Sequence, residues 1–156
     1  MLRLSKMTDY AVVVLTTLAH ADGALHTANS LADRTGLPMP TVQKLLKLLA
    51  RGELLQSHRG ALGGYSLSRE PARINVVHII EAIEGPIALT DCVDGGSGGC
   101  GVQSLCSRKT HWEKVNGAVR RALEDVTLAD MATPSLFDFD PKPAARAALA
   151  GRSTAG

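Results

Sequence analysis

Apolar residues at the start of this chain recur at helical spacing rather than in strict alternation. They fall three or four positions apart, at Met7, Ala11, Val14, Leu15 and Leu18. The pair Asp22-Gly23, a common turn signal, follows directly. The pattern therefore predicts an amphipathic helix from about Leu4 to Ala21.

Residues 27–51 predict two further short helices joined by a tight turn. Thr27 can cap the first of them, which should run to Asp33, and Gly36 can adopt the positive φ of the turn. Pro40 suits the first position of the next helix, predicted over 40–51. That helix turns Val42, Leu45, Leu46 and Leu49 inward, and its outer face carries Thr41, Gln43, Lys44 and Lys47. Two helices arranged in this way are typical of a helix-turn-helix.

A β-hairpin is predicted after the third helix. Two short stretches, 54–58 and 65–67, flank a glycine-rich tip that carries Arg59. A wing of this kind can place Arg59 in a DNA minor groove. The glycines could alternatively form a phosphate-binding loop, but no helix opens directly after them.

The second half of the chain predicts two more helices. The first covers 74–84 and ends at Gly85-Pro86. The second runs from about 108 to 131, and its apolar positions alternate at three and four residues: Trp112, Val115, Val119, Ala122, Val126 and Ala129. That alternation is the a/d pattern of a helix that pairs with a partner, so we expect a homodimer. The remaining residues, 132–156, are rich in Ala, Pro and Gly and are expected to form a disordered tail.

Composition supports a mainly helical protein, because 45% hydrophobic residues with only 3% aromatics favours a core of Leu, Val, Ile and Ala. The net charge of +2 is uninformative, but residues 34–73 contain seven basic and two acidic side chains. This basic stretch coincides with the helix-turn-helix and the wing, as contacts to double-stranded DNA require. No apolar run is long enough to cross a membrane, and we expect a cytoplasmic protein with reduced thiols.

The chain has three cysteines, Cys92, Cys100 and Cys106, and all lie on a glycine-rich segment. Three thiolates gathered on one segment suit an iron–sulfur cluster or another soft metal. Structural zinc is an alternative, although the spacing lacks a C-x-x-C pair. A segment of Gly, Ser and Asp should offer no core that could bury these thiols. A thiol enzyme would need a base, such as His111 or His58, with a pocket and an oxyanion hole, so we expect no enzyme.

Several longer segments carry a resemblance to a known family. They are RLSKMTDYAV, LADRTGLPMPTVQKLLKLLARGELL, RGALGGYSLSR, EAIEGPIAL and TLADM, together with the three cysteines. The chain resembles the winged-helix iron–sulfur transcriptional regulators that include IscR and NsrR, most closely their SUF-system branch. The likeness covers residues 1–131. It implies a homodimeric repressor of iron–sulfur cluster assembly genes that binds a palindromic operator.

The resemblance also implies a 2Fe–2S or 4Fe–4S cluster held by the three cysteines and a fourth ligand. The IscR-like pattern has a histidine three residues after the last cysteine, where this chain has Lys109, and His111 lies two residues further on. The NsrR-like pattern takes an aspartate from the first helix of the opposite subunit. Asp9 occupies that place, and we favour it as the fourth ligand.

Together, the patterns and the resemblance divide the chain into four parts. These are a winged helix-turn-helix domain (1–84), a cysteine-rich cluster-binding loop (85–107), a dimerisation helix (108–131) and the tail (132–156). The third helix would enter the major groove, with Gln43 as the best candidate for a base contact. Two alternatives are a zinc-stabilised or thiol-redox-sensing DNA-binding regulator without a cluster, and an iron–sulfur carrier protein.

Overall fold

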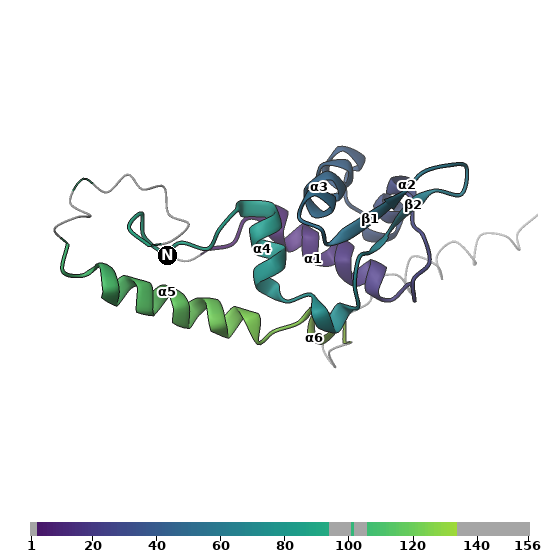
Figure 1. Ribbon diagram of the computed structural model, residues 1–156. Helices are drawn as coiled ribbons and strands as arrows, with labels where there is room; N and C mark the ends of the chain where they lie inside the picture. The colour runs from purple at the N-terminus through teal and green to yellow at the C-terminus, as the bar shows by residue number, and fades with distance from the viewer. Residues whose placement is uncertain (1–2, 94–100, 102–105, 134–156) are drawn as a thin grey trace, which may run out of the picture.

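The computed structural model describes residues 3–93, 101 and 106–133, which form a mainly helical protein with an antiparallel β-hairpin (Figure 1). The elements are α1 (Lys6–Ala19), α2 (Ala28–Thr35), α3 (Met39–Arg51), β1 (Leu55–His58), β2 (Gly64–Leu67), the 3-10 helix η1 (Pro71–Arg73), α4 (Val76–Glu84), α5 (Lys109–Glu124) and α6 (Leu128–Ala132). This order matches the predicted fold class, a winged helix-turn-helix followed by a long helix. The predicted tail beyond residue 133 and Cys100 lie outside the described residues.

The first helix is shorter at both ends than its apolar pattern predicts. It begins at Lys6 because Ser5 is its N-cap, whose hydroxyl accepts a hydrogen bond from the Thr8 backbone N–H at 3.3 Å. It ends at Ala19, and Asp22 then adopts a positive φ of 46° in the turn that follows. Four apolar side chains of α1 enter the core: Ala11, Val14, Leu15 and Leu18.

The helix-turn-helix forms where its sequence predicts, although α2 runs on to Thr35, two residues beyond the predicted end at Asp33. The Thr27 hydroxyl caps α2 by accepting from the Ser30 backbone N–H at 3.1 Å, and Gly36 ends that helix with a φ of 73°. Helix α3 begins at Met39, so Pro40 lies at its second position rather than its first. All four predicted inward residues of α3 are buried: Val42, Leu45, Leu46 and Leu49.

The hairpin pairs β1 with β2 in antiparallel register, from Leu55 opposite Leu67 to His58 opposite Gly64. A third segment joins it, because His26 and Tyr65 exchange backbone hydrogen bonds of 3.0 and 2.8 Å. Gly64 is required by this close approach, since a Cβ there would lie 2.9 Å from the His26 carbonyl oxygen. The hairpin is therefore fixed to the helix-turn-helix through the segment that leads into α2.

The prediction of one continuous helix over 108–131 is wrong. Helix α5 ends at Glu124, and Thr127 starts α6 with a capping box that it forms with Asp130. Backbone bonds hold the bend in place, because Leu128 N–H donates to the Ile74 carbonyl at 2.7 Å and Val76 N–H donates to the Val126 carbonyl at 3.0 Å. Leu128 is fully buried in the core, so the chain must leave the line of α5 to place it there.

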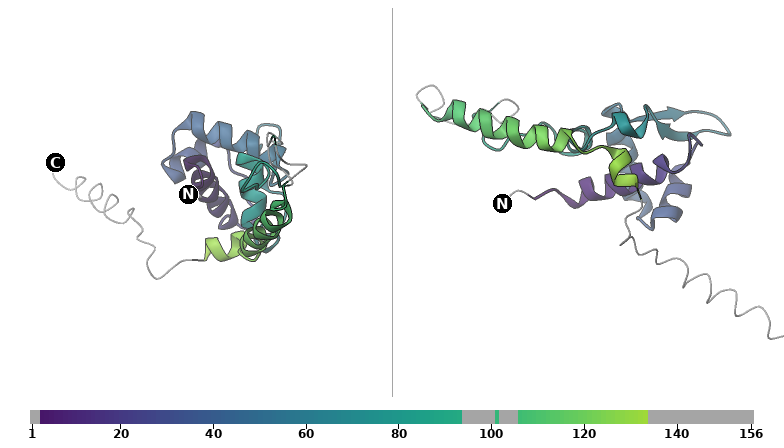
Figure 2. Two further views of the ribbon diagram at one scale, coloured as in Figure 1. Left: turned by 90° about the vertical axis from the view of Figure 1, so that its left-hand side faces the viewer. Right: turned by 90° about the horizontal axis from the view of Figure 1, so that it is seen from below.

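Helix α5 lies outside the main hydrophobic core. The core draws residues from α1, α2, α3, β1, α4 and α6 but none from α5. Figures 1 and 2 show the N-terminal half of α5 extending past α4, at the end of the molecule remote from the hairpin. Across the described part of the chain, no helix has the length and apolar character that a membrane span requires.

Candidate functional site

The outer face of α3 presents polar and basic side chains. Burial of the apolar face fixes the rotation of the helix, so Gln43, Lys44 and Lys47 are exposed and Thr41 is half-buried. The first turn of α3 contains no acidic residue, and it follows Pro38 and the turn at Gly36. The arrangement offers one amide and two ammonium groups to a ligand, the chemistry that suits base edges and phosphates.

Arg59 lies at the exposed tip of the hairpin, where the Gly63 N–H donates to the Gly60 carbonyl at 3.0 Å and closes the turn. The tip also carries Leu62, which is 91% exposed. Only three residues separate α3 from β1, and Leu55 at the start of β1 is buried in the same core as the apolar face of α3. The structure thus gives Arg59 and the three exposed α3 side chains a common, solvent-facing framework.

The structure describes two of the three cysteines, Cys92 and Cys106, and neither forms a disulfide. Cys92 is only 7% exposed, with its sulfur 3.2 Å from the Thr90 hydroxyl, so the expectation that its segment offers no core is wrong for this residue. The next residue, Val93, is also buried and lines a cavity beside α5. Cys106 is half-buried directly ahead of α5, and its carbonyl accepts from the Lys109 N–H at 3.3 Å.

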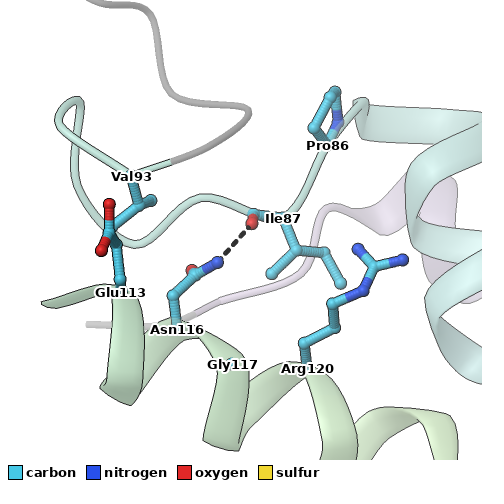
Figure 3. Close-up of a pocket in the computed structure, with 7 residues that line it drawn as sticks. All are labelled: Pro86, Ile87, Val93, Glu113, Asn116, Gly117 and Arg120. Atoms are coloured by element: carbon cyan, nitrogen blue, oxygen red, sulfur yellow. Dashed lines mark hydrogen bonds between the residues drawn. The ribbon is translucent and has the colours of Figure 1, made fainter. Parts of the chain in front are cut away.

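Asn116 attaches residues 87–89, at the start of the cysteine segment (85–107), to α5. This residue was not identified from the sequence. Its amide donates to the Ile87 carbonyl and its side-chain oxygen accepts from the Leu89 N–H, both at 3.0 Å (Figure 3). A cavity of about 400 Å³ lies beside this contact. One turn further along α5, Arg120 pairs with Glu81 of α4, which raises the pKa of the Arg120 guanidinium. Asn116 lies beside the predicted a/d positions rather than on one of them, so the a/d pattern gave no signal for this attachment.

A second polar link joins the start of the cysteine segment to α1. The Glu84 carboxylate, at the end of α4, accepts from the Thr8 hydroxyl and from the Ser5 backbone N–H, the latter at 2.9 Å. These hydrogen bonds, led by the one from Thr8, lower the pKa of Glu84. Thr8 is 2% exposed, and Gly85-Pro86 follow Glu84 immediately. The entry to the cysteine segment is therefore fixed relative to the first turn of α1.

Asp9, the predicted fourth ligand, is exposed in the first turn of α1. The structure does not bring it together with Cys92 and Cys106 within the protomer. More generally, among the described residues no three His, Cys, Asp or Glu side chains approach closely enough to hold a metal ion. Two apolar side chains of α5, Trp112 and Val115, remain 44% and 45% exposed in the protomer.

Comparison with known proteins places these features in context. Residues 4–134 match the family described as "Rrf2: Iron-dependent Transcriptional regulator". The chain is 32% identical over 151 residues to the HTH-type transcriptional regulator IscR of Cereibacter sphaeroides, covering 87% of this chain and 96% of that protein.

Two solved structures are similar to this one. CymR, the global cysteine regulator of B. subtilis, has a TM-score of 0.64 at 29% identity and covers 85% of this chain and 98% of its own. IscR of T. potens has a TM-score of 0.59 at 29% identity and covers 99% of this chain and 94% of its own.

Proposed function

Because the chain belongs to the Rrf2 family of transcriptional regulators, we propose that it is a DNA-binding repressor whose operator affinity depends on an iron–sulfur cluster, and that it controls cluster assembly (SUF) genes. It is a regulator rather than an enzyme. The observation that carries the proposal is the combination of a cationic α3 face with cysteines at the far end of α5. Because such a regulator binds chromosomal DNA, the proposal places this protein in the cytoplasm.

In the proposed complex, α3 enters the major groove of double-stranded DNA. Gln43 is the candidate for a bidentate base contact, Lys44 and Lys47 bind phosphates, and Thr41 contributes a hydroxyl. Arg59 reaches the adjacent minor groove from the hairpin tip. The exposure of Arg59, Gln43 and both lysines supports these assignments. Two copies of the unit would read the two halves of a palindromic operator.

The proposed dimer forms through α5. Trp112 and Val115 are exposed in the protomer, and burying them against a second α5 removes that surface from water. An apolar cavity of about 330 Å³ continues this surface, bounded on one side by Leu4 and Leu89 and on the other by Val119. The dimer would include only the Lys109–Glu124 part of the predicted helix, because α6 belongs to the core.

The proposed cluster is held by Cys92, Cys100 and Cys106 with the partner subunit's Asp9. The donor set fits an iron–sulfur cluster, because the two described thiols are unpaired and both are anchored near the N-terminal end of α5. When bound, the cluster would supply a centre that is changed by loss of iron or by oxidation. Asp9 is exposed on α1 and free to reach across a dimer, and Glu84 holds that turn of α1 against the start of the cysteine segment.

A second candidate function follows from the likeness to the cysteine regulator of B. subtilis. In that case the thiols would respond to oxidation or hold zinc, and DNA binding would need no cluster. The burial of Cys92 disfavours redox sensing at this residue, because a buried thiol reacts slowly.

Anaerobic purification with an absorption spectrum, followed by counting of iron, sulfide and zinc per chain, separates the two candidates. The proposal predicts broad absorption near about 400 nm with iron and sulfide in equal amounts. A colourless protein with one zinc per chain would instead make the cysteines a structural clip. A colourless protein without metal would favour thiol sensing.

A further inference from the structure

Asn116 is an unusual residue for its position. It is 9% exposed and is the buried residue of α5, a helix that otherwise contributes nothing to the core. Buried amides are costly unless their donor and acceptor are both satisfied. Here both are satisfied by one short stretch of backbone, through Ile87 and Leu89 (Figure 3).

The geometry of this contact fixes a direction as well as a position. The Ile87 carbonyl and the Leu89 N–H flank Ala88 and are two residues apart, as are the groups that one residue pairs with in a parallel β-ladder. The Asn116 carboxamide therefore makes the two hydrogen bonds that a residue of a neighbouring parallel strand would make. Two hydrogen bonds to one planar group prevent the segment from sliding along α5 or rotating about a single bond.

The position of Cys92 follows from this anchor. A turn begins directly after Leu89, because the Val93 N–H donates to the Thr90 carbonyl at 3.3 Å and the Thr90 hydroxyl lies 3.2 Å from the Cys92 sulfur. Val93, which is 5% exposed, lines the same cavity as Asn116. Cys92 thus lies three residues beyond the anchor, in a turn whose last residue, Val93, lines the cavity beside α5.

The neighbouring ion pair cannot replace this anchor. Arg120 and Glu81 are about one-third exposed, and pairs of that kind contribute little because water screens them. They also connect α5 to α4 rather than to the cysteine segment. The hydrogen bonds of Asn116, in contrast, are partly shielded and act directly on the backbone that leads to Cys92.

We infer that Asn116 is a positioning residue for Cys92: its side chain docks residues 87–89 on α5 and thereby keeps this thiol buried and at a fixed distance from Cys106. The docking itself requires no metal. Its role in holding Cys92 ready as a cluster ligand rests on the proposed function.

The experiment measures the alkylation rate of single thiols with N-ethylmaleimide in full-length, metal-free protein. One set of proteins retains only Cys92, through Cys100→Ser and Cys106→Ser, and the other retains only Cys106. Asn116→Leu keeps the branching of the side chain at Cγ and removes both hydrogen bonds. We expect it to accelerate alkylation of Cys92 by about tenfold or more, as the loss of two net hydrogen bonds implies, and to leave the rate at Cys106 within about twofold.

Arg121→Ala is the matched control, because Arg121 is an exposed residue on the same helix and should change neither rate. Asn116→Asp is the second variant. It retains the acceptor for the Leu89 N–H, loses the donor to the Ile87 carbonyl and should give an intermediate Cys92 rate. An unchanged Cys92 rate in Asn116→Leu would overturn the inference. Equal acceleration at both cysteines would also overturn it, since that result indicates general destabilisation of α5.

The inference and the proposed function can fail separately. Iron and sulfide bound after anaerobic reconstitution are measured on wild type and on Asn116→Leu with all three cysteines present. Reduced cluster content in the variant alone supports the positioning role. Absence of a cluster from wild type would contradict the proposed function while the alkylation result still decides the role of Asn116.

Discussion

Replacement of Leu128 by Ala tests whether α6 packs in the core of the protomer or continues the dimerisation helix. Leu128 is fully buried against the core residues of α1 and lies on the short helix α6. Truncating a fully buried leucine removes its transfer free energy and leaves a cavity, and the usual cost is about 2–5 kcal/mol. The lower half of that range is expected here, because the five-residue α6 can shift to fill part of the space.

The matched comparison is Val126→Ala. Val126 is 40% exposed, so its truncation should lower the free energy of unfolding by less than about 1 kcal/mol. Urea unfolding followed by circular dichroism, at several protein concentrations, measures both variants. A continuous α5 with a regular a/d pattern would give the opposite ranking, with Val126→Ala weakening the dimer and Leu128→Ala nearly neutral. That ranking would refute the reasoning.

Three further substitutions test other parts of the structure. Glu84→Ala should lower the free energy of unfolding by about 1 kcal/mol or less at neutral pH, since the carboxylate is exposed. Because the pKa of Glu84 is lowered in the folded state, its contribution is complete above the ordinary value of 4.5 and is lost as pH falls through the lowered value, so urea midpoints of wild type and variant should approach each other in acid. Gly64→Ala should cost about 1–3 kcal/mol in thermal unfolding, whereas Gly101→Ala, with open space around its Cβ, should not. Lys44→Ala should reduce the slope of log affinity against log salt by about 0.9 for each phosphate that the protein no longer neutralises, measured by fluorescence anisotropy on operator DNA, whereas equal slopes would remove Lys44 from the interface.

Local signals in the sequence were sufficient for the DNA-binding half of the molecule. The cap at Thr27, the turn at Gly36 and the apolar face of α3 each depend on residues a few positions apart, and the structure confirms all three. Short-range periodicity and capping therefore determine these elements. The candidate DNA contacts follow from the same face and stay predictions.

Contacts between distant segments explain what the sequence did not reveal. Thr127 and Asp130 form a recognisable capping box, but the regular apolar spacing continues past it, and the bend is held by pairing with Ile74, far earlier in the chain. The attachment of residues 87–89 to α5 likewise depends on Asn116, which lies 27 to 29 residues away along the chain. Neither the composition nor the spacing of the cysteine segment carries that information.

Operator affinity measured with and without the cluster tests the central claim most directly. Anaerobically prepared wild type, with its iron and sulfide counted, is compared by fluorescence anisotropy with the same protein after chelation and with a variant that combines Cys92→Ala, Cys100→Ala and Cys106→Ala. We expect the cluster-bearing protein to differ from the other two by at least about tenfold, the effect of a coupling free energy of about 1.4 kcal/mol, and those two to agree with each other. Equal affinity in all three would contradict a cluster-dependent regulator and leave a DNA-binding protein that responds to another signal.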